Sequence, residues 1–152
     1  MTPTLIEAPR ESPFTGLGFL TVTPKRLDLA FRFTLLDEGM NTSECLYWLN
    51  EIHRYYRRKV IVVWDGLSAH QAAAAIMDEE HPGWFEFFPF PTYSPELNPV
   101  EPCWHHAKNI EMANYTAKNK DELARKIFQA TENINNNKQL LHSFFKYARL
   151  KL

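Results

Sequence analysis

The stretch Phe88-Pro-Phe-Pro-Thr-Tyr-Ser-Pro-Glu-Leu-Asn-Pro-Val-Glu101 decides the expected fold, because it ends with a carboxylate on the first turn of a predicted helix. A second carboxylate, Asp65, directly follows the apolar run Val60-Ile-Val-Val-Trp64. This run is continuous rather than alternating, which is typical of a strand covered on both faces inside a sheet. Asp65 therefore stands at a strand end, where open α/β sheets bind their ligands. A folded α/β domain can bring Asp65 and Glu101 together, and that arrangement suits a divalent metal ion.

Predicted strands and helices alternate along the rest of the chain. Residues 1–13 are rich in proline and form an irregular leader with at most a short strand at residues 4–6. Beyond the leader, the patterns predict a hairpin at 17–23 and 27–33, strands at 60–64 and 84–88, and helices at 41–57, 68–80, 98–112, 119–133 and 138–149. This order predicts one α/β domain with a mixed sheet flanked by helices.

The composition indicates one globular domain and no membrane partner. The 152 residues are 45% hydrophobic, enough for one core, and no apolar run approaches the roughly 20 residues of a membrane helix. The start of the chain has no signal-peptide pattern, so a cytoplasmic chain is expected. In that reducing compartment Cys45 and Cys103 are expected to be ordinary thiols.

The charge pattern does not by itself indicate a nucleic-acid-binding protein. The net charge is −1, whereas nucleic-acid-binding domains usually carry a basic patch or stripe. One local basic run, His53-Arg-Tyr-Tyr-Arg-Arg-Lys59, contains two aromatic residues. Two interpretations of it stay open: a solvated helix end that suits the helix dipole, and a contact to the DNA backbone.

Each of the two acids also has a purely structural interpretation. Asp65 can be a loop or cap residue before the helix that begins at Ser68. Asn98 and Glu101 have the spacing of a capping box, which alone accounts for a glutamate at that position. Neither acid identifies a site without the sequence around it.

The longer context resembles a known family. Trp64-Asp-Gly-Leu-Ser-Ala-His70, followed by Pro91-Thr-Tyr-Ser-Pro-Glu-Leu-Asn-Pro-Val-Glu-Pro-Cys-Trp104 and then Lys108, is similar to the catalytic domain of DDE transposases. The similarity points to the bacterial insertion-sequence branch of the mariner-like superfamily and runs from about Phe14 to Ile127. It implies an RNase H-like fold at residues 14–133, after the leader at 1–13 and before a C-terminal helix at 134–152.

The resemblance also implies a chemistry and a set of partners. In this family three acids hold two Mg²⁺ ions, for which Mn²⁺ substitutes, and the ions promote DNA cleavage and strand transfer. The implied partners are transposon ends and target DNA, so the protein would be cytoplasmic and associated with the nucleoid when on DNA.

Individual residues receive roles only through the resemblance. Asp65 matches the second acid and Glu101 the third, while Asn98 and Pro99 match the loop that orients the helix of Glu101. His70 matches a position where histidine is common, and it is either a metal ligand or a helix-start and packing residue. Lys108 either touches a phosphate or lies on a solvated helix face.

The chain departs from the family at the first acid. That acid belongs to a first, central strand upstream of the hairpin, and the candidates Glu7, Glu11, Asp28 and Asp37 do not stand where the motif requires it. The expected sheet therefore lacks its central strand and exposes two rows of backbone groups. Three ways to cover them are expected: the hairpin shifts onto the 60–64 strand, residues 4–6 fill the gap, or a second chain supplies the strand.

Three functional hypotheses follow. The first is a transposase catalytic-domain segment whose activity is impaired because the first acid is absent. The second is a catalytically inactive remnant that acts as a binding or homodimerising module through its aromatic surfaces and C-terminal helices. The third is an unrelated metal-dependent hydrolase that uses Asp65, His70 and Glu101 and prefers Zn²⁺ to Mg²⁺ or Mn²⁺.

Overall fold

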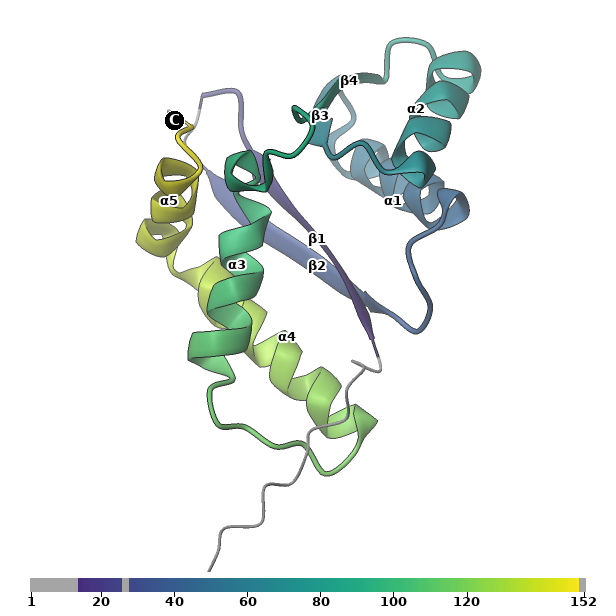
Figure 1. Ribbon diagram of the computed structural model, residues 1–152. Helices are drawn as coiled ribbons and strands as arrows, with labels where there is room; N and C mark the ends of the chain where they lie inside the picture. Colours follow the sequence, from purple (N-terminus) through teal and green to yellow (C-terminus); the bar gives the residue numbers. More distant parts are fainter. Residues whose placement is uncertain (1–13, 26–27, 151–152) are drawn as a thin grey trace, which may run out of the picture.

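The predicted order of strands and helices is confirmed in the computed structural model, which describes residues 14–25 and 28–150 (Figure 1). The short strand expected at residues 4–6 lies outside the described residues. The elements are β1 (Thr15–Val22), β2 (Leu29–Leu36), α1 (Thr42–Tyr56), β3 (Val60–Trp64), α2 (Ser68–Glu80), β4 (Phe85–Pro89), a 3₁₀ turn (Pro95–Leu97), α3 (Val100–His106), a π-helical turn (Ala107–Glu111), α4 (Lys120–Asn136) and α5 (Lys138–Tyr147). The fold is α/β, with small sheets flanked by five helices, consistent with an RNase H-like fold.

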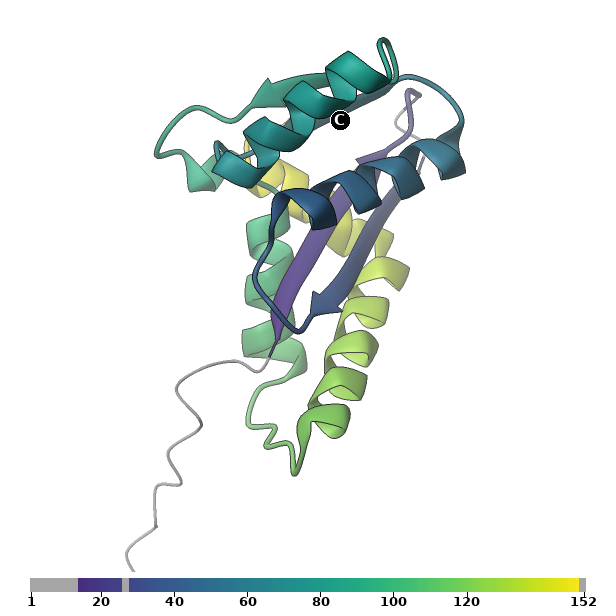
Figure 2. The same ribbon diagram turned by 90° about the vertical axis from the view of Figure 1, so that its right-hand side faces the viewer.

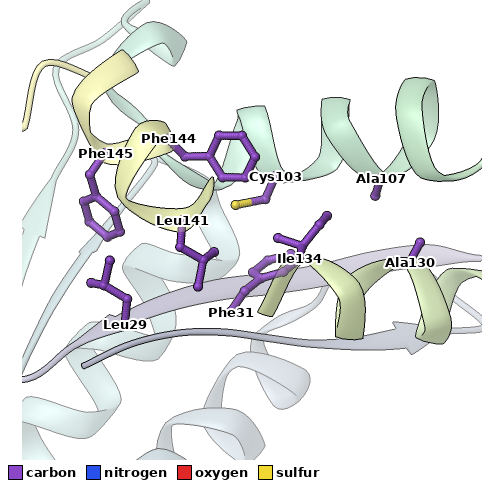
Figure 3. Packing of buried hydrophobic residues seen from close by; sticks show 9 residues of the cluster. All are labelled: Leu29, Phe31, Cys103, Ala107, Ala130, Ile134, Leu141, Phe144 and Phe145. Carbon is purple, nitrogen blue, oxygen red and sulfur yellow. The ribbon is translucent and has the colours of Figure 1, made fainter. Parts of the chain in front are cut away.

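The hairpin of β1 and β2 is antiparallel and packs one face on the C-terminal helices. Its register pairs Thr15 with Leu36 and Val22 with Leu29. The buried side chains on this face meet α3, α4 and α5 in one cluster, made of Leu29, Phe31, Cys103, Ala107, Ala130, Ile134, Leu141, Phe144 and Phe145 (Figure 3). Most of these residues are apolar and fully enclosed, so their burial supplies the main stabilisation of this half of the molecule.

Two glycines of β1 let α3 approach the hairpin closely. A Cβ atom at Gly18 would lie 2.7 Å from Trp104 Cζ2 and 3.0 Å from Phe31 Cε2, and one at Gly16 would lie 3.1 Å from Trp104 Cη2. The Trp104 ring therefore occupies the space that side chains at these two positions would fill.

The second half of the molecule is a parallel β3-α2-β4 unit with its own core. Val60 pairs with Phe85 and Val62 with Phe87. One face of this sheet packs on α1 and α2 in a cluster of Cys45, Leu49, Ala73, Met77 and Phe85. Both cysteines of the chain are buried and free, which confirms that they form no disulfide.

The prediction that β3 is covered on both faces is wrong. Ile61 and Val63 point away from α1 and α2, and their side chains are 64% and 52% exposed. Both helices of this half pack on the same side of the sheet, and the described residues leave the side chains of the other side about half exposed. An apolar run typical of an interior strand is thus left half bare.

The four strands form two separate pairs within residues 14–25 and 28–150. The expected shift of the hairpin onto β3 is therefore wrong, while a strand from a second chain stays a prediction. Helix α1 joins the halves instead, because it lies across the outer face of the hairpin (Figure 2). Its Trp48 ring lies 6.5 Å from the Phe19 ring, and its Tyr55 ring lies under the Arg32 guanidinium at 4.8 Å.

None of the helices in the described part of the chain is long and apolar enough to cross a membrane.

The contact between Trp104 and the hairpin predicts a clear difference between two glycine substitutions. Gly18→Ala is expected to lower the free energy of unfolding by about 1–3 kcal/mol, because the added methyl group overpacks against two rings. Gly39→Ala is the control, since a Cβ atom there meets nothing within 4 Å, and it is expected to be neutral or stabilising by up to about 1 kcal/mol. Urea unfolding of both variants measures this, and equal stabilities would contradict the packing described.

Candidate active site

Asp65 lies directly after β3, where its carboxylate is held by two short-range hydrogen bonds. Asp65 Oδ1 accepts the backbone N–H of Leu67 at 3.2 Å and Nδ1–H of His70 at 2.7 Å. The side chain is 61% exposed. Its other oxygen, Oδ2, has no hydrogen-bond partner among the described residues. The predicted loop role is therefore confirmed for one oxygen, and the second stays free for a ligand.

A stack of rings orients His70 toward Asp65. The His70 imidazole lies parallel to the Trp64 indole at 4.5 Å, and Trp64 stacks on Phe87 of β4 at 5.1 Å. Because the stack holds the ring plane, Nδ1 points at the carboxylate. Of the two interpretations of His70, the structure bears out the helix-start and packing role. The stack itself was missed from the sequence, although aromatic residues in two neighbouring strands, Trp64 and Phe87, were a signal for it.

Glu101 lies on the first turn of α3, and its carboxylate is not used by the cap of that helix. In a capping box the Asn98 side chain would accept the N–H of Glu101, and the Glu101 carboxylate would accept the N–H of Asn98. Instead Asn98 Oδ1 accepts the N–H of Val100 at 3.1 Å, and the N–H of Asn98 bonds the carbonyl of Pro95 at 3.0 Å. The capping-box explanation for Glu101 is therefore wrong, and its exposed carboxylate faces solvent.

The start of α3 is anchored by the residues that follow Glu101. Cys103 is fully buried, and its thiol donates to the carbonyl of Pro99 at 3.4 Å. Burial raises the pKa of the Cys103 thiol to about 12. The next residue, Trp104, packs edge-on against Phe31 with ring centroids 5.4 Å apart. These contacts fix the first turn of α3, and with it the backbone of Glu101, against the hairpin.

The two acids stand on different elements, Asp65 directly after β3 and Glu101 on the first turn of α3. The first turn of α3 is the end of that helix nearer the β3–β4 sheet, as both views show (Figures 1 and 2). No hydrogen bond or ion pair links Asp65 to Glu101. Among the described residues, no three His, Cys, Asp or Glu side chains gather closely enough to hold a metal ion. The predicted convergence of Asp65 and Glu101 on one ion stays a prediction.

The free carboxylate oxygens of this site suit a magnesium ion that keeps several water ligands better than an ion enclosed by protein ligands. The free oxygens of Asp65 and Glu101 are hard carboxylate donors, and Mg²⁺ commonly binds proteins through one or two carboxylates while it keeps several waters. Zinc sites instead use three or four closely spaced nitrogen, sulfur or oxygen ligands. No three such side chains gather among the described residues, so the predicted trio of Asp65, His70 and Glu101 gives no support to a zinc hydrolase.

A family model described as DDE superfamily endonuclease matches residues 20–124, more than half of the chain. The chain belongs to this family. The match includes Asp65, His70 and Glu101 and extends from β1 to the first turn of α4. It confirms the predicted resemblance to the DDE endonucleases, which are transposase-like nucleases that act on DNA and generally use divalent metals. No curated protein matches the chain.

The packing of α3 predicts that Cys103 is unreactive in the folded endonuclease domain. At about pH 8 a thiol with a pKa near 12 is ionised in only about one molecule in ten thousand, and the thiolate is the reactive form. In a Cys45→Ala variant, a thiol reagent is expected to label Cys103 very slowly in the native state and rapidly in concentrated guanidinium. Equal rates in the two states would show that α3 is not held as described.

Proposed function

We infer that this chain is a catalytic-domain segment of a DDE transposase of the mariner-like insertion-sequence branch, with Asp65 and Glu101 as metal-binding acids. The observation that supports this most is that both carboxylates keep oxygens free of protein partners within the region matched by the family. Among the described residues, Glu101 uses neither oxygen in a cap or an ion pair, and Asp65 uses only Oδ1, which bonds Leu67 and His70. The proposed substrate is DNA, as transposon ends and target.

In the proposed site, the residues of the chain mainly hold the two carboxylates in place, and the bound ions supply the chemistry. Asp65 Oδ1 is held by Leu67 and His70, so Oδ2 is presented from a fixed loop. Glu101 is presented from a helix start that Cys103 and Trp104 hold in place. When bound, divalent ions activate the attacking oxygen and stabilise the leaving oxygen of a phosphodiester.

We propose that the isolated chain binds such ions weakly and cleaves DNA poorly. Most of the rate of phosphoryl transfer comes from holding the ions and the nucleophile in line. Two carboxylates without a third nearby acid, among the described residues, cannot hold two ions in that way. The chain is thus proposed to carry only part of the active site.

A calorimetric titration with Mn²⁺ tests the two acids. The wild-type chain is expected to bind Mn²⁺ weakly, and Asp65→Asn and Glu101→Gln are each expected to bind at least about tenfold more weakly, because each removes one charged oxygen donor. Glu96→Gln is the matched control, since Glu96 is an exposed acid in the turn just before α3. No binding by the wild-type chain, or equal losses in all three variants, would refute the assignment.

Nicking of supercoiled plasmid in the same samples tests the expected lack of activity. We expect no nicking above background with Mn²⁺ or Mg²⁺. Nicking that Asp65→Asn abolishes would show a complete active site with a third ligand, and would overturn the proposal that the site is only partly built.

The second hypothesis, a binding or homodimerising module, is favoured by a separate observation. Ile61 and Val63 of β3 are exposed on the bare face of their sheet, and Phe88, which pairs with Val63, is 47% exposed beside them. A contiguous apolar surface of this kind is typical of an interaction site. This role does not require metal binding.

A further inference from the structure

Tyr93 has the most exposed of the large hydrophobic side chains in the described part of the chain. It lies in the turn between β4 and the 3₁₀ turn, and it is 97% exposed. Within residues 14–25 and 28–150 its side chain makes no hydrogen bond, ion pair or ring contact. Single exposed apolar residues are common on protein surfaces, so exposure alone does not indicate a function. The backbone at this position is a second and separate observation.

The backbone of Tyr93 has a conformation that is unfavourable for an aromatic residue. Its φ is 58°, in the left-handed region that glycine and asparagine occupy most readily. Arg57 and Arg149 also have positive φ, but they follow α1 and α5, where a left-handed residue commonly ends a helix. The remaining described non-glycine case, Asn114, is of a residue type that tolerates this conformation. Tyr93 has neither explanation, and backbone strain of this kind clusters at functional sites.

The loop that presents Tyr93 connects the two candidate acids. It begins beside the strand that carries Asp65, because the N–H of Phe90 donates to the carbonyl of Trp64 at 2.7 Å. It ends at the first turn of α3, which carries Glu101 (Figure 1). Three extended residues span at most about 11 Å, so the Cα atom of Tyr93 lies within about 11 Å of that of Phe90. The ring is therefore presented close to the strand end that Asp65 follows.

The segment around this ring is restrained by hydrogen bonds and by prolines. The N–H of Leu97 donates to the carbonyl of Ser94 at 3.1 Å, and the N–H of Asn98 donates to the carbonyl of Pro95 at 3.0 Å. Pro95 and Pro91 stand on either side of the turn and limit the backbone conformations around it. An aromatic ring on a restrained loop loses little conformational freedom on binding, which favours affinity.

We propose that the Tyr93 ring stacks on a nucleobase of the DNA strand whose phosphodiester lies at Asp65 and Glu101. This inference rests on the proposed DNA substrate and adds a residue that positions it. Every base has a π-face, so a contact of this kind tolerates different sequences. A base inside a continuous duplex is already stacked on both sides. The base that meets Tyr93 is therefore an unpaired one, which costs least to unstack.

The fluorescence of 2-aminopurine tests this contact, because stacking on an aromatic ring quenches this base analogue. The probes are DNA duplexes with a short single-stranded 3′ overhang that carries the analogue at each overhang position in turn. They are titrated with the full chain and Mn²⁺, and the anisotropy of a dye on the blunt end reports binding. The wild-type chain is expected to quench at least one probe. Tyr93→Asn is expected to lose that quenching and to bind at least about fivefold more weakly.

The strained backbone gives the same variant a second readout. Asparagine tolerates a positive φ better than tyrosine does, so Tyr93→Asn is expected to be at least as stable in urea as the wild-type chain. A ring that served the fold would instead leave the variant less stable when removed. Tyr93→Phe keeps the ring without its hydroxyl group, and it is expected to quench and bind as the wild-type chain does.

Tyr147→Asn is the matched control, since it makes the same change on a tyrosine of α5 that is 71% exposed. It is expected to leave quenching and affinity unchanged. Wild-type quenching by Tyr93→Asn, or an equal loss in Tyr147→Asn, would refute the stacking contact, while DNA binding by the wild-type chain would leave the proposed function standing. Failure of the wild-type chain to bind any of the duplexes would refute both.

Discussion

The contact between Trp104 and the two glycines of β1 is the interaction on which the rest of the structure depends. The indole ring fills the space above Gly16 and Gly18 and meets Phe31 and Phe33 edge-on, with centroids 5.4 and 6.0 Å apart. It thereby closes the hairpin core from the side of α3. Since Glu101 lies one turn earlier on the same helix, the packing of an apolar ring also determines where an acid is presented.

The two candidate acids belong to different halves of the molecule, each with its own core. Asp65 ends the sheet that packs on α1 and α2, and Glu101 begins the helix that packs on the hairpin. Helix α1 contacts the hairpin through Trp48 and Tyr55, while the loop after β4 runs directly into the 3₁₀ turn before α3. The distance between the acids therefore depends on how two cores sit against one another, rather than on either core alone.

The sequence predicted local structure well because local structure depends on nearby residues. The cap at Asn41, which accepts the N–H of Glu44, and the order of all strands and helices followed from spacing and turn residues. The loop motif also led correctly to the DDE endonuclease family. What could not be predicted depends on contacts distant in sequence. The run at 60–64 reads as a strand covered on both faces, and only the three-dimensional arrangement shows that the described residues leave one face exposed. The Asn98–Glu101 spacing likewise fits a cap, but Asn98 bonds Val100 instead.

The wide separation in sequence of the hairpin and its packing partners bears on how the protein folds during synthesis. The N–H of Phe31 bonds Oδ1 of Asn135, 104 residues later, whereas β3, α2 and β4 are contiguous and complete their sheet within one short segment. At about 5–20 residues per second, a ribosome needs about 5–20 s to make the intervening chain. During that interval the apolar face of the hairpin has no partner from α4 or α5. The strands β3 and β4 can pair well before the hairpin core closes. Until α4 and α5 are made, the nascent chain therefore needs something else to shield the apolar face of the hairpin from water.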